Sequence, residues 1–159
     1  SCSLVGSEMC IRDSIITSLE LDPAEMEKRN IHLQKKYAEI EENEVRFEEL
    51  HCEDAEYLIV AFGSCARIAQ KAMEIAREEG IKVGLLRPIT LWPFPSKAIA
   101  ARAAQVKGIL TVELNAGQMV EDVRLAVECK VPVEHFGRLG GIVPDPDEVI
   151  TALKEKLIK

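Results

Sequence analysis

The chain has 159 residues, of which 47% are hydrophobic and 30% charged, and its formal net charge is −7. These values are typical of one folded domain with an appendage. The acidic balance argues against a nucleic-acid-binding surface, because phosphate groups attract clustered Lys and Arg. No apolar run approaches the ~20 residues that cross a bilayer, so we expect no transmembrane helix and no membrane partner.

The cysteines do not predict a metal site. No C-x-x-C pair occurs, and no spacing suits zinc or an iron–sulfur cluster. The five are Cys2, Cys10, Cys52, Cys65 and Cys129. An odd number of cysteines in a chain rich in Lys and Glu is typical of a reduced protein, so we expect a cytoplasmic location.

The first 14 residues, SCSLVGSEMCIRDS, differ in residue pattern from the rest of the chain. They show no periodicity and lead into no helix cap, and they resemble a translated sequencing-adapter read-through. A secretory signal would need a basic start and a longer apolar stretch. We therefore interpret residues 1–14 as a non-native appendage and residues 15–54 as a linker with an amphipathic helix.

That helix is predicted from Asp22 to Asn43, with Asp22 as N-cap and Pro23 at the first helical position. Its apolar residues line one stripe, namely Met26, Leu33, Tyr37 and Ile40. The helix either packs on its own domain or connects to an absent N-terminal domain, and we favour the connector. Val45–Leu50 alternates in polarity, so it is either an edge strand or the end of the linker.

A βαβ unit comes next. Tyr57–Phe62 is an unbroken apolar run, as expected of a strand buried on both faces of a parallel sheet. Ser64 is placed to cap the next helix, and Gly80 to end it in the left-handed conformation. Lys82–Leu86 then reads as a second parallel strand.

The rest of the chain continues the alternation of helices and strands. We expect helices at 96–105 and 119–128, strands at 108–113 and 131–136, and a last helix from Pro146, capped by Asp145 and Glu148. Pro132 favours an edge or strand-start position for its strand. The prediction is a three-layer αβα domain with a mostly parallel sheet at residues 55–159.

Two weak candidates for anion binding lie in loops after strands. Gly63 and Ser64 precede a helix N-terminus, and Arg138 stands among three glycines with Gly140. Neither has a complete phosphate-binding motif. Cys65, beside the first site, is either a small buried residue, which we favour, or a thiol whose pKa the helix lowers.

Two further segments are candidates for subunit interfaces. Trp92 and Phe94 stand between prolines in a rigid apolar loop. Glu113, Asn115 and Gln118 leave a buried strand and need partners, which are local backbone groups, a neighbouring subunit or a ligand. His135 has no metal-ligand companion and is interpreted as structural. We assign no catalytic residue.

Four motifs occur in one order: VAFGS, GIKVGLLRPITLWPFP, VELNAGQM and FGRLGGIVPDPDEV. Together they resemble the α subunit of 2-oxoacid:ferredoxin oxidoreductases, most of all the type acting on 2-oxoisovalerate (3-methyl-2-oxobutanoate). The resemblance runs from about Ile15 to the end. It implies a fold like the C-terminal domain of transketolase.

The resemblance also implies the reaction. The family decarboxylates a 2-oxoacid oxidatively to an acyl-CoA, using thiamine diphosphate with Mg²⁺, and passes electrons through iron–sulfur clusters to ferredoxin. The pyrimidine-binding N-terminal domain is absent from this sequence, so we expect the chain to bind none of these cofactors alone. Its expected partners are that domain, the β and γ/δ subunits, and ferredoxin as acceptor.

The expected role is therefore structural, in assembly of the complex. The alternative is a free-standing α/β module that binds a small ligand or nucleotide at the two glycine-containing loops. A thiol redox protein built on Cys65 is a third possibility, which would require a reactive thiol at neutral pH.

Overall fold

The computed structural model describes residues 19–158, and the predicted appendage at 1–14 lies outside them. The chain divides into two compact units, with the boundary between Glu39 and Ile40. The first unit contains most of one helix, and the second contains the α/β domain. None of the helices in the described part of the chain is long and apolar enough to span a membrane.

The predicted amphipathic helix is present as α2, Pro23–Asn43. Asp22 caps it as expected, because its Oδ1 accepts a hydrogen bond of 2.8 Å from the backbone N–H of Ala24. None of the 21 residues of α2, all of which the structure describes, is buried.

The α/β domain is built on a five-stranded sheet in the order β1-β3-β2-β4-β5. The strands are β1 Phe47–Leu50, β2 Tyr57–Ala61, β3 Val83–Pro88, β4 Gly108–Glu113 and β5 Val133–Gly137. β1 pairs antiparallel with β3, and the other pairs are parallel. Of the two alternatives for residues 45–50, the edge strand is correct, so the sheet also includes residues before 55.

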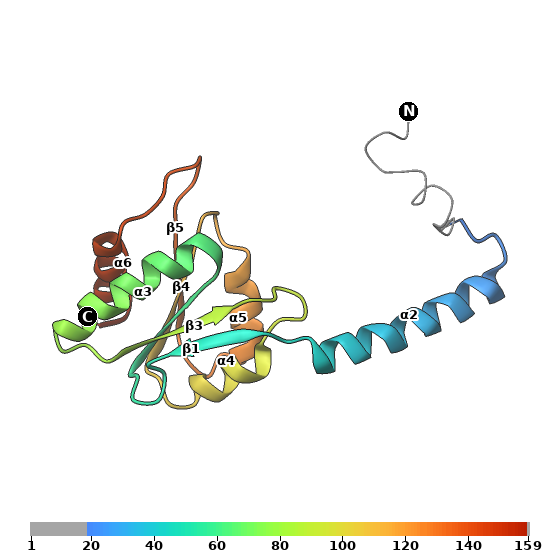
Figure 1. The fold of residues 1–159 in the computed structure, drawn as a ribbon, viewed down its shortest axis with the longest axis horizontal. Helices are drawn as coiled ribbons and strands as arrows, with labels where there is room; N and C mark the ends of the chain where they lie inside the picture. The colour runs from blue at the N-terminus through green and yellow to red at the C-terminus, as the bar shows by residue number, and fades with distance from the viewer. Residues whose placement is uncertain (1–18, 159) are drawn as a thin grey trace, which may run out of the picture. The chain divides into compact units, whose positions relative to one another are not determined.

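Helices cover both faces of the sheet, which confirms the three-layer αβα prediction (Figure 1). α3 (Gly63–Glu78) and α6 (Pro146–Leu153) pack on one face, and the π-helix η1 (Lys154–Ile158) continues α6. α4 (Ser96–Ala103) and α5 (Met119–Val127) pack on the other. The even and odd residues of β2 and β4 therefore enter two different cores, as a strand buried on both faces requires.

Three local predictions fare differently. Asp145 and Glu148 form the expected capping box, and Gly80 has the expected positive φ of 85°. The predicted cap at Ser64 is wrong: extended Phe62, two residues earlier, occupies the N-cap position, and α3 begins at Gly63. Ser64 therefore lies inside the first helical turn, where its hydroxyl cannot reach back to cap it.

Candidate functional site

Every loop selected from the sequence lies at one edge of the sheet. The four parallel strands β2, β3, β4 and β5 all end there, and this carboxyl edge is where open α/β sheets bind ligands. The loops after these strands begin at Phe62, Ile89, Leu114 and Arg138. The fold thus brings together both the anion-site and the interface candidates.

Glu113, at the end of β4, is fully buried and caps α5. Its Oε2 accepts hydrogen bonds from the backbone N–H groups of Gln118 (3.2 Å) and Met119 (2.8 Å), and its Oε1 accepts one from Val120 (3.0 Å). A carboxylate at a helix N-terminus is stabilised by these donors and by the helix dipole. Of the alternatives that the sequence left open, local backbone groups are the partners, so Glu113 does not lie on a subunit-facing surface.

The turn after Glu113 is closed by its own side chains. Asn115 Oδ1 accepts a hydrogen bond of 2.7 Å from the backbone N–H of Gly117, whose φ is 111°. Gln118 is exposed, although its backbone N–H is bound by Glu113. Asn115 and Gln118 therefore remain interface candidates, presented by a turn that Glu113 holds in place.

His135, on β5, packs beside this cap. Its Nδ1 lies 3.3 Å from Thr111 Oγ1 and 3.4 Å from Glu113 Oε1. The backbone also comes close here, since a Cβ added to Gly137 would lie 2.2 Å from the carbonyl oxygen of Asn115 and 2.6 Å from His135 Nε2. Glycine at position 137 is thus required by packing, and the His135 ring contacts Thr111 and Glu113 within the domain.

The Arg138 side chain, which the sequence places among glycines, is bonded to helix α6. Its Nη2 donates to Glu148 Oε1 at 2.8 Å, and Glu148 Oε2 in turn accepts from the N–H of Asp145 in the capping box. Gly140 and Gly141 both have positive φ, with the N–H of Ile142 bonded to the carbonyl of Leu139 across them. The glycines form a tight turn, which is the alternative to an anion nest.

Gly63 and Ser64 are exposed at the start of α3, and Gly63 has a φ of 57°. The N-cap residue of α3, Phe62, makes no side-chain capping hydrogen bond. Cys65, one residue further, is buried, and desolvation together with the nearby Glu113 carboxylate raises the pKa of its thiol. The buried-residue interpretation of Cys65 is therefore correct, and a lowered pKa is not found.

The loop after β3 exposes apolar side chains. Trp92 and Ile89 are each 55% exposed, whereas Phe94 is half-buried against the α4/α5 core. The loop is anchored at its base, where Thr90 Oγ1 accepts from the N–H of Arg46 (3.0 Å) and donates to the carbonyl of Pro93 (2.9 Å). The peptide bond between Trp92 and Pro93 is cis. Trp92 thus stands partly exposed on a loop that Thr90 anchors at its base.

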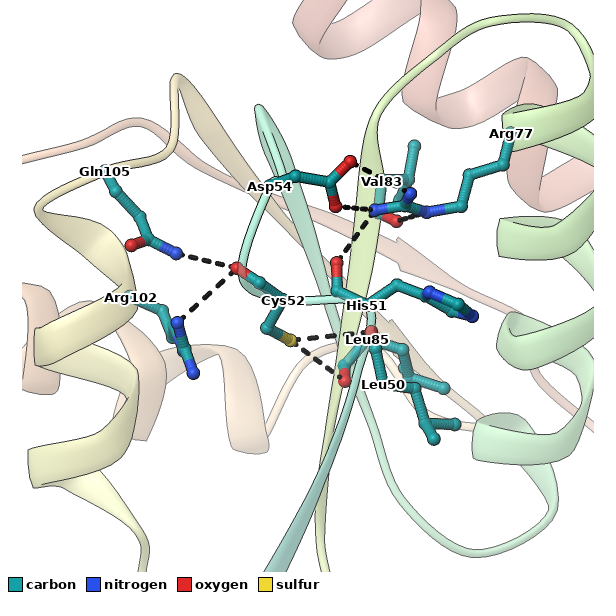
Figure 2. Close-up of polar contacts among 9 residues, drawn as sticks. All are labelled: Leu50, His51, Cys52, Asp54, Arg77, Val83, Leu85, Arg102 and Gln105. Carbon is teal, nitrogen blue, oxygen red and sulfur yellow. Dashed lines mark hydrogen bonds and ion pairs between the residues drawn. The ribbon is translucent and has the colours of Figure 1, made fainter.

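The opposite edge of the sheet contains a polar cluster that no motif in the sequence indicated (Figure 2). Arg77, near the end of α3, donates to the carbonyls of His51 (2.8 Å) and Val83 (2.7 Å) and to Asp54 Oδ1 (2.6 Å). This guanidinium holds the pKa of the Asp54 carboxyl below its ordinary value. The only signal in the sequence was a basic residue in the last turn of a helix.

From the other face of the sheet, Arg102 on α4 binds the same connection. It donates to both carboxylate oxygens of Glu49 (3.0 and 2.6 Å) and to the carbonyl of Cys52 (3.5 Å), which also accepts from Gln105. The Cys52 thiol is buried and donates to the carbonyl of Leu85, and desolvation, followed by the Glu49 charge, raises its pKa to about 11. These groups tie residues 49–54 to α3 and α4, so the cluster is structural.

This fold matches a known family. The model for "Pyruvate:ferredoxin oxidoreductase core domain II" matches residues 55–149. The chain belongs to this family. The family model thus spans the sheet from β2 to β5 and the start of α6.

Two relatives of this core domain II are the ketoisovalerate oxidoreductase subunits VorB of Methanothermobacter marburgensis and Methanothermobacter thermautotrophicus. The first is 44% identical over 98% of this chain and 44% of its own length. The second is 48% identical over 89% of this chain and 40% of its own length. The chain therefore spans less than half the length of these curated relatives.

Solved structures agree with the fold of core domain II. The 2-oxoglutarate:ferredoxin oxidoreductase of Magnetococcus marinus, solved with 2-oxoglutarate, coenzyme A and succinyl-CoA, superposes with a TM-score of 0.73 at 25% identity. The superposed region covers 86% of this chain and 24% of the Magnetococcus marinus chain. A split-gene transketolase matches with a TM-score of 0.61 at 20% identity, over 71% of this chain and 41% of its own, and supports the fold alone.

Proposed function

We propose that this chain serves as core domain II in the α subunit of a 2-oxoacid:ferredoxin oxidoreductase of the ketoisovalerate type. The complex would convert 2-oxoisovalerate to an acyl-CoA and pass the electrons to ferredoxin. Support comes from the 44% and 48% identity to the two VorB subunits. Identity to 2-oxoglutarate synthase subunits is lower, at 32% and 34% over 64% of this chain.

Within that complex, the role that the geometry supports is assembly, and the chain is not catalytic alone. The observation that carries this role is the contrast at the carboxyl edge between bound polar groups and exposed apolar ones. Glu113 and Arg138 are both occupied by bonds within the domain. The exposed apolar residues of the same edge are Ile89, Leu91, Trp92, Leu114, Leu139, Ile142 and Val143. Such a surface suits contact with protein.

The described residues offer no cluster for a metal cofactor of such an enzyme. Cys52 and Cys65 are buried and Cys129 is exposed, and no group of three His, Cys, Asp or Glu within 19–158 is arranged to hold a metal ion. The Arg138 guanidinium, our candidate for an anionic ligand, is paired with Glu148. We propose that thiamine diphosphate, Mg²⁺, the iron–sulfur clusters and coenzyme A are bound by other parts of the complex.

The proposed partners are a pyrimidine-binding domain of the same α subunit, the β and γ/δ subunits, and ferredoxin as electron acceptor. We propose that the complex works in the cytoplasm. The apolar carboxyl edge is the surface that we assign to contact with the first two of these partners.

A chimeric complex tests this proposal. The region of M. marburgensis VorB that aligns with this chain would be replaced by the chain, and the subunit co-expressed with its partner subunits. We expect 2-oxoisovalerate to reduce a viologen dye in a CoA-dependent manner. VorB lacking the region serves as the inactive control.

A complex that assembles but oxidises only a different 2-oxoacid would contradict the substrate class. A chimera that does not assemble, although the chain itself is folded, would contradict the assembly role. Titration of the chain alone with coenzyme A and AMP would reveal the alternative, a ligand-binding module, if either bound with micromolar affinity.

A further inference from the structure

Helix α2 carries a seven-residue repeat. Met26, Leu33 and Ile40 succeed one another at intervals of seven, and Asn30 and Tyr37 form a second column four residues after the first two. In heptad notation, the first column occupies d positions and the second a positions. A repeat of seven predicts a helix in a left-handed coiled coil, because the seam stays on the partner only at 3.5 residues per turn.

None of the 21 residues of α2, all within the described range, is buried. Most of the stability of a protein helix comes from packing of its apolar face, so a partner on this face would stabilise α2. The heptad seam is the stripe that this helix offers.

Asn30 indicates what the partner is. In a parallel, in-register pair, an Asn at an a position faces the same Asn of the second helix, and the two amides bond to each other. An antiparallel pair would place Asn30 against Leu33 or Ile40, where a buried amide without a partner is costly. Only a second copy of this helix is certain to carry Asn in that layer.

The charges that flank the seam favour the same arrangement. Lys36 occupies a g position, and in a parallel pair it lies across from Glu41, at an e position of the second copy. Arg29, the preceding g residue, then meets uncharged Gln34. Two antiparallel registers would keep four pairs of seam residues in contact, with Asn30 against Leu33 or against Ile40. In these registers Lys36 would face Arg29 or Lys36 of the second copy, which are like charges. At the start of α2, Asp22 would face Glu27 of the second copy, a like-charge pair, but Asp22 precedes the helix as its cap, where its Oδ1 accepts from the N–H of Ala24.

We propose that α2 is a dimerisation element that pairs two copies of this chain through a parallel, in-register coiled coil. The seam consists of Met26, Asn30, Leu33, Tyr37 and Ile40. This inference stands on the heptad and its charges, and it does not depend on the proposed enzyme.

Sedimentation velocity of the complete chain tests the seam. We expect dimers over a range of about 1 to 100 µM, typical of short two-stranded coiled coils. Leu33→Lys places a charge in the seam and should weaken dimerisation at least about 100-fold. Ile31→Lys is the matched control, because Ile31 is 51% exposed on α2 outside the seam. Ile31→Lys should retain the dimer.

Charge exchange and crosslinking test the orientation. Lys36→Glu should weaken dimerisation by about tenfold, and adding Glu41→Lys should restore it. In a chain with Cys2, Cys10 and Cys129 changed to Ser, Asn30→Cys should form a disulfide between two copies under mild oxidation. A monomeric native chain, a dimer insensitive to Leu33→Lys, or a dimer that Asn30→Cys does not crosslink would overturn the proposal.

Discussion

The two edges of the sheet at which the parallel strands begin and end differ in the side chains that they expose. At the amino edge, the connection from β1 to β2 is held by two arginines, Arg77 from α3 and Arg102 from α4. They donate to the carbonyls of His51 and Cys52 and to the carboxylates of Asp54 and Glu49. At the carboxyl edge, Glu113 is equally well bound, yet the surrounding loops expose apolar side chains such as Ile89 and Trp92.

The difference separates the groups that stabilise the domain from the groups that are available for contact with other domains or subunits. Internally bound charges at both edges stabilise the fold, so substitutions there should change the free energy of unfolding. Most exposed apolar side chains of the α/β domain lie at the carboxyl edge, so substitutions there should change assembly instead. Single substitutions at the two edges test this division, from the largest expected effect on stability to the smallest.

Replacing Glu113 with Gln should have the largest effect. The amide would present N–H donors to backbone N–H groups that now bond to a carboxylate, and at least one would be left unpaired. We expect a loss of about 3 kcal/mol in the free energy of unfolding, measured with urea. Glu121→Gln, exposed in the first turn of the same helix, is the control and should cost less than about 0.5 kcal/mol. Equal losses would refute the capping role.

Gly137→Ala should be the next most severe change. The new Cβ would lie 2.2 Å from the backbone oxygen of Asn115, so β5 or the Asn115 turn must move. We expect a loss of about 2 to 3 kcal/mol. Gly108→Ala is the matched control, because its Cβ would meet only the flexible end of Leu157. If both variants were equally stable, the close approach at Gly137 would not exist in solution.

Arg77→Met tests the amino edge. The substitution removes donors from two carbonyls and from Asp54 while keeping the apolar stem, and we expect it to cost about 1 to 2 kcal/mol. Arg67→Met, on an exposed position of the same helix, should be nearly neutral. A neutral Arg77→Met would mean that the connection at 49–54 is held by Arg102 and the β1–β3 ladder alone.

The strands and helices could be predicted well because their signals are local and strong. The apolar runs at 57–61 and 108–113 and the capping box of Asp145 and Glu148 each determine structure within a few residues. The sequence could not decide which partner Glu113 has, because its three backbone donors converge on the carboxylate only when α5 folds back over β4. The ion pairs of Arg77 with Asp54 and of Arg102 with Glu49 join residues 23 and 53 positions apart, and such pairings have no local pattern.

Cys52 gives a pH-dependent test of the amino edge. Because burial raises the pKa of this thiol from 9.0 to about 11, the unfolded chain releases its proton first as the pH rises. Stability should therefore fall above pH 9, and Cys52 alone would contribute a loss of about 1 kcal/mol between pH 8 and pH 10. Comparison with Cys52→Ala isolates this contribution from that of other groups. Identical pH slopes for the two chains would show that the thiol is not buried.

Trp92→Ala should separate stability from assembly most clearly. The indole is 55% exposed, and the loop is anchored by Thr90 and Arg46, so its removal should change the free energy of unfolding by less than about 0.5 kcal/mol. If the carboxyl edge is a protein contact, the same change in the chimeric VorB should weaken subunit association by about tenfold or more, because buried Trp residues dominate interface energetics. Leu125→Ala, on a residue 76% exposed on α5, is the control for loss of an exposed apolar group. Normal assembly with lowered stability would show that Trp92 serves its own domain, and the division between the two edges would then fail.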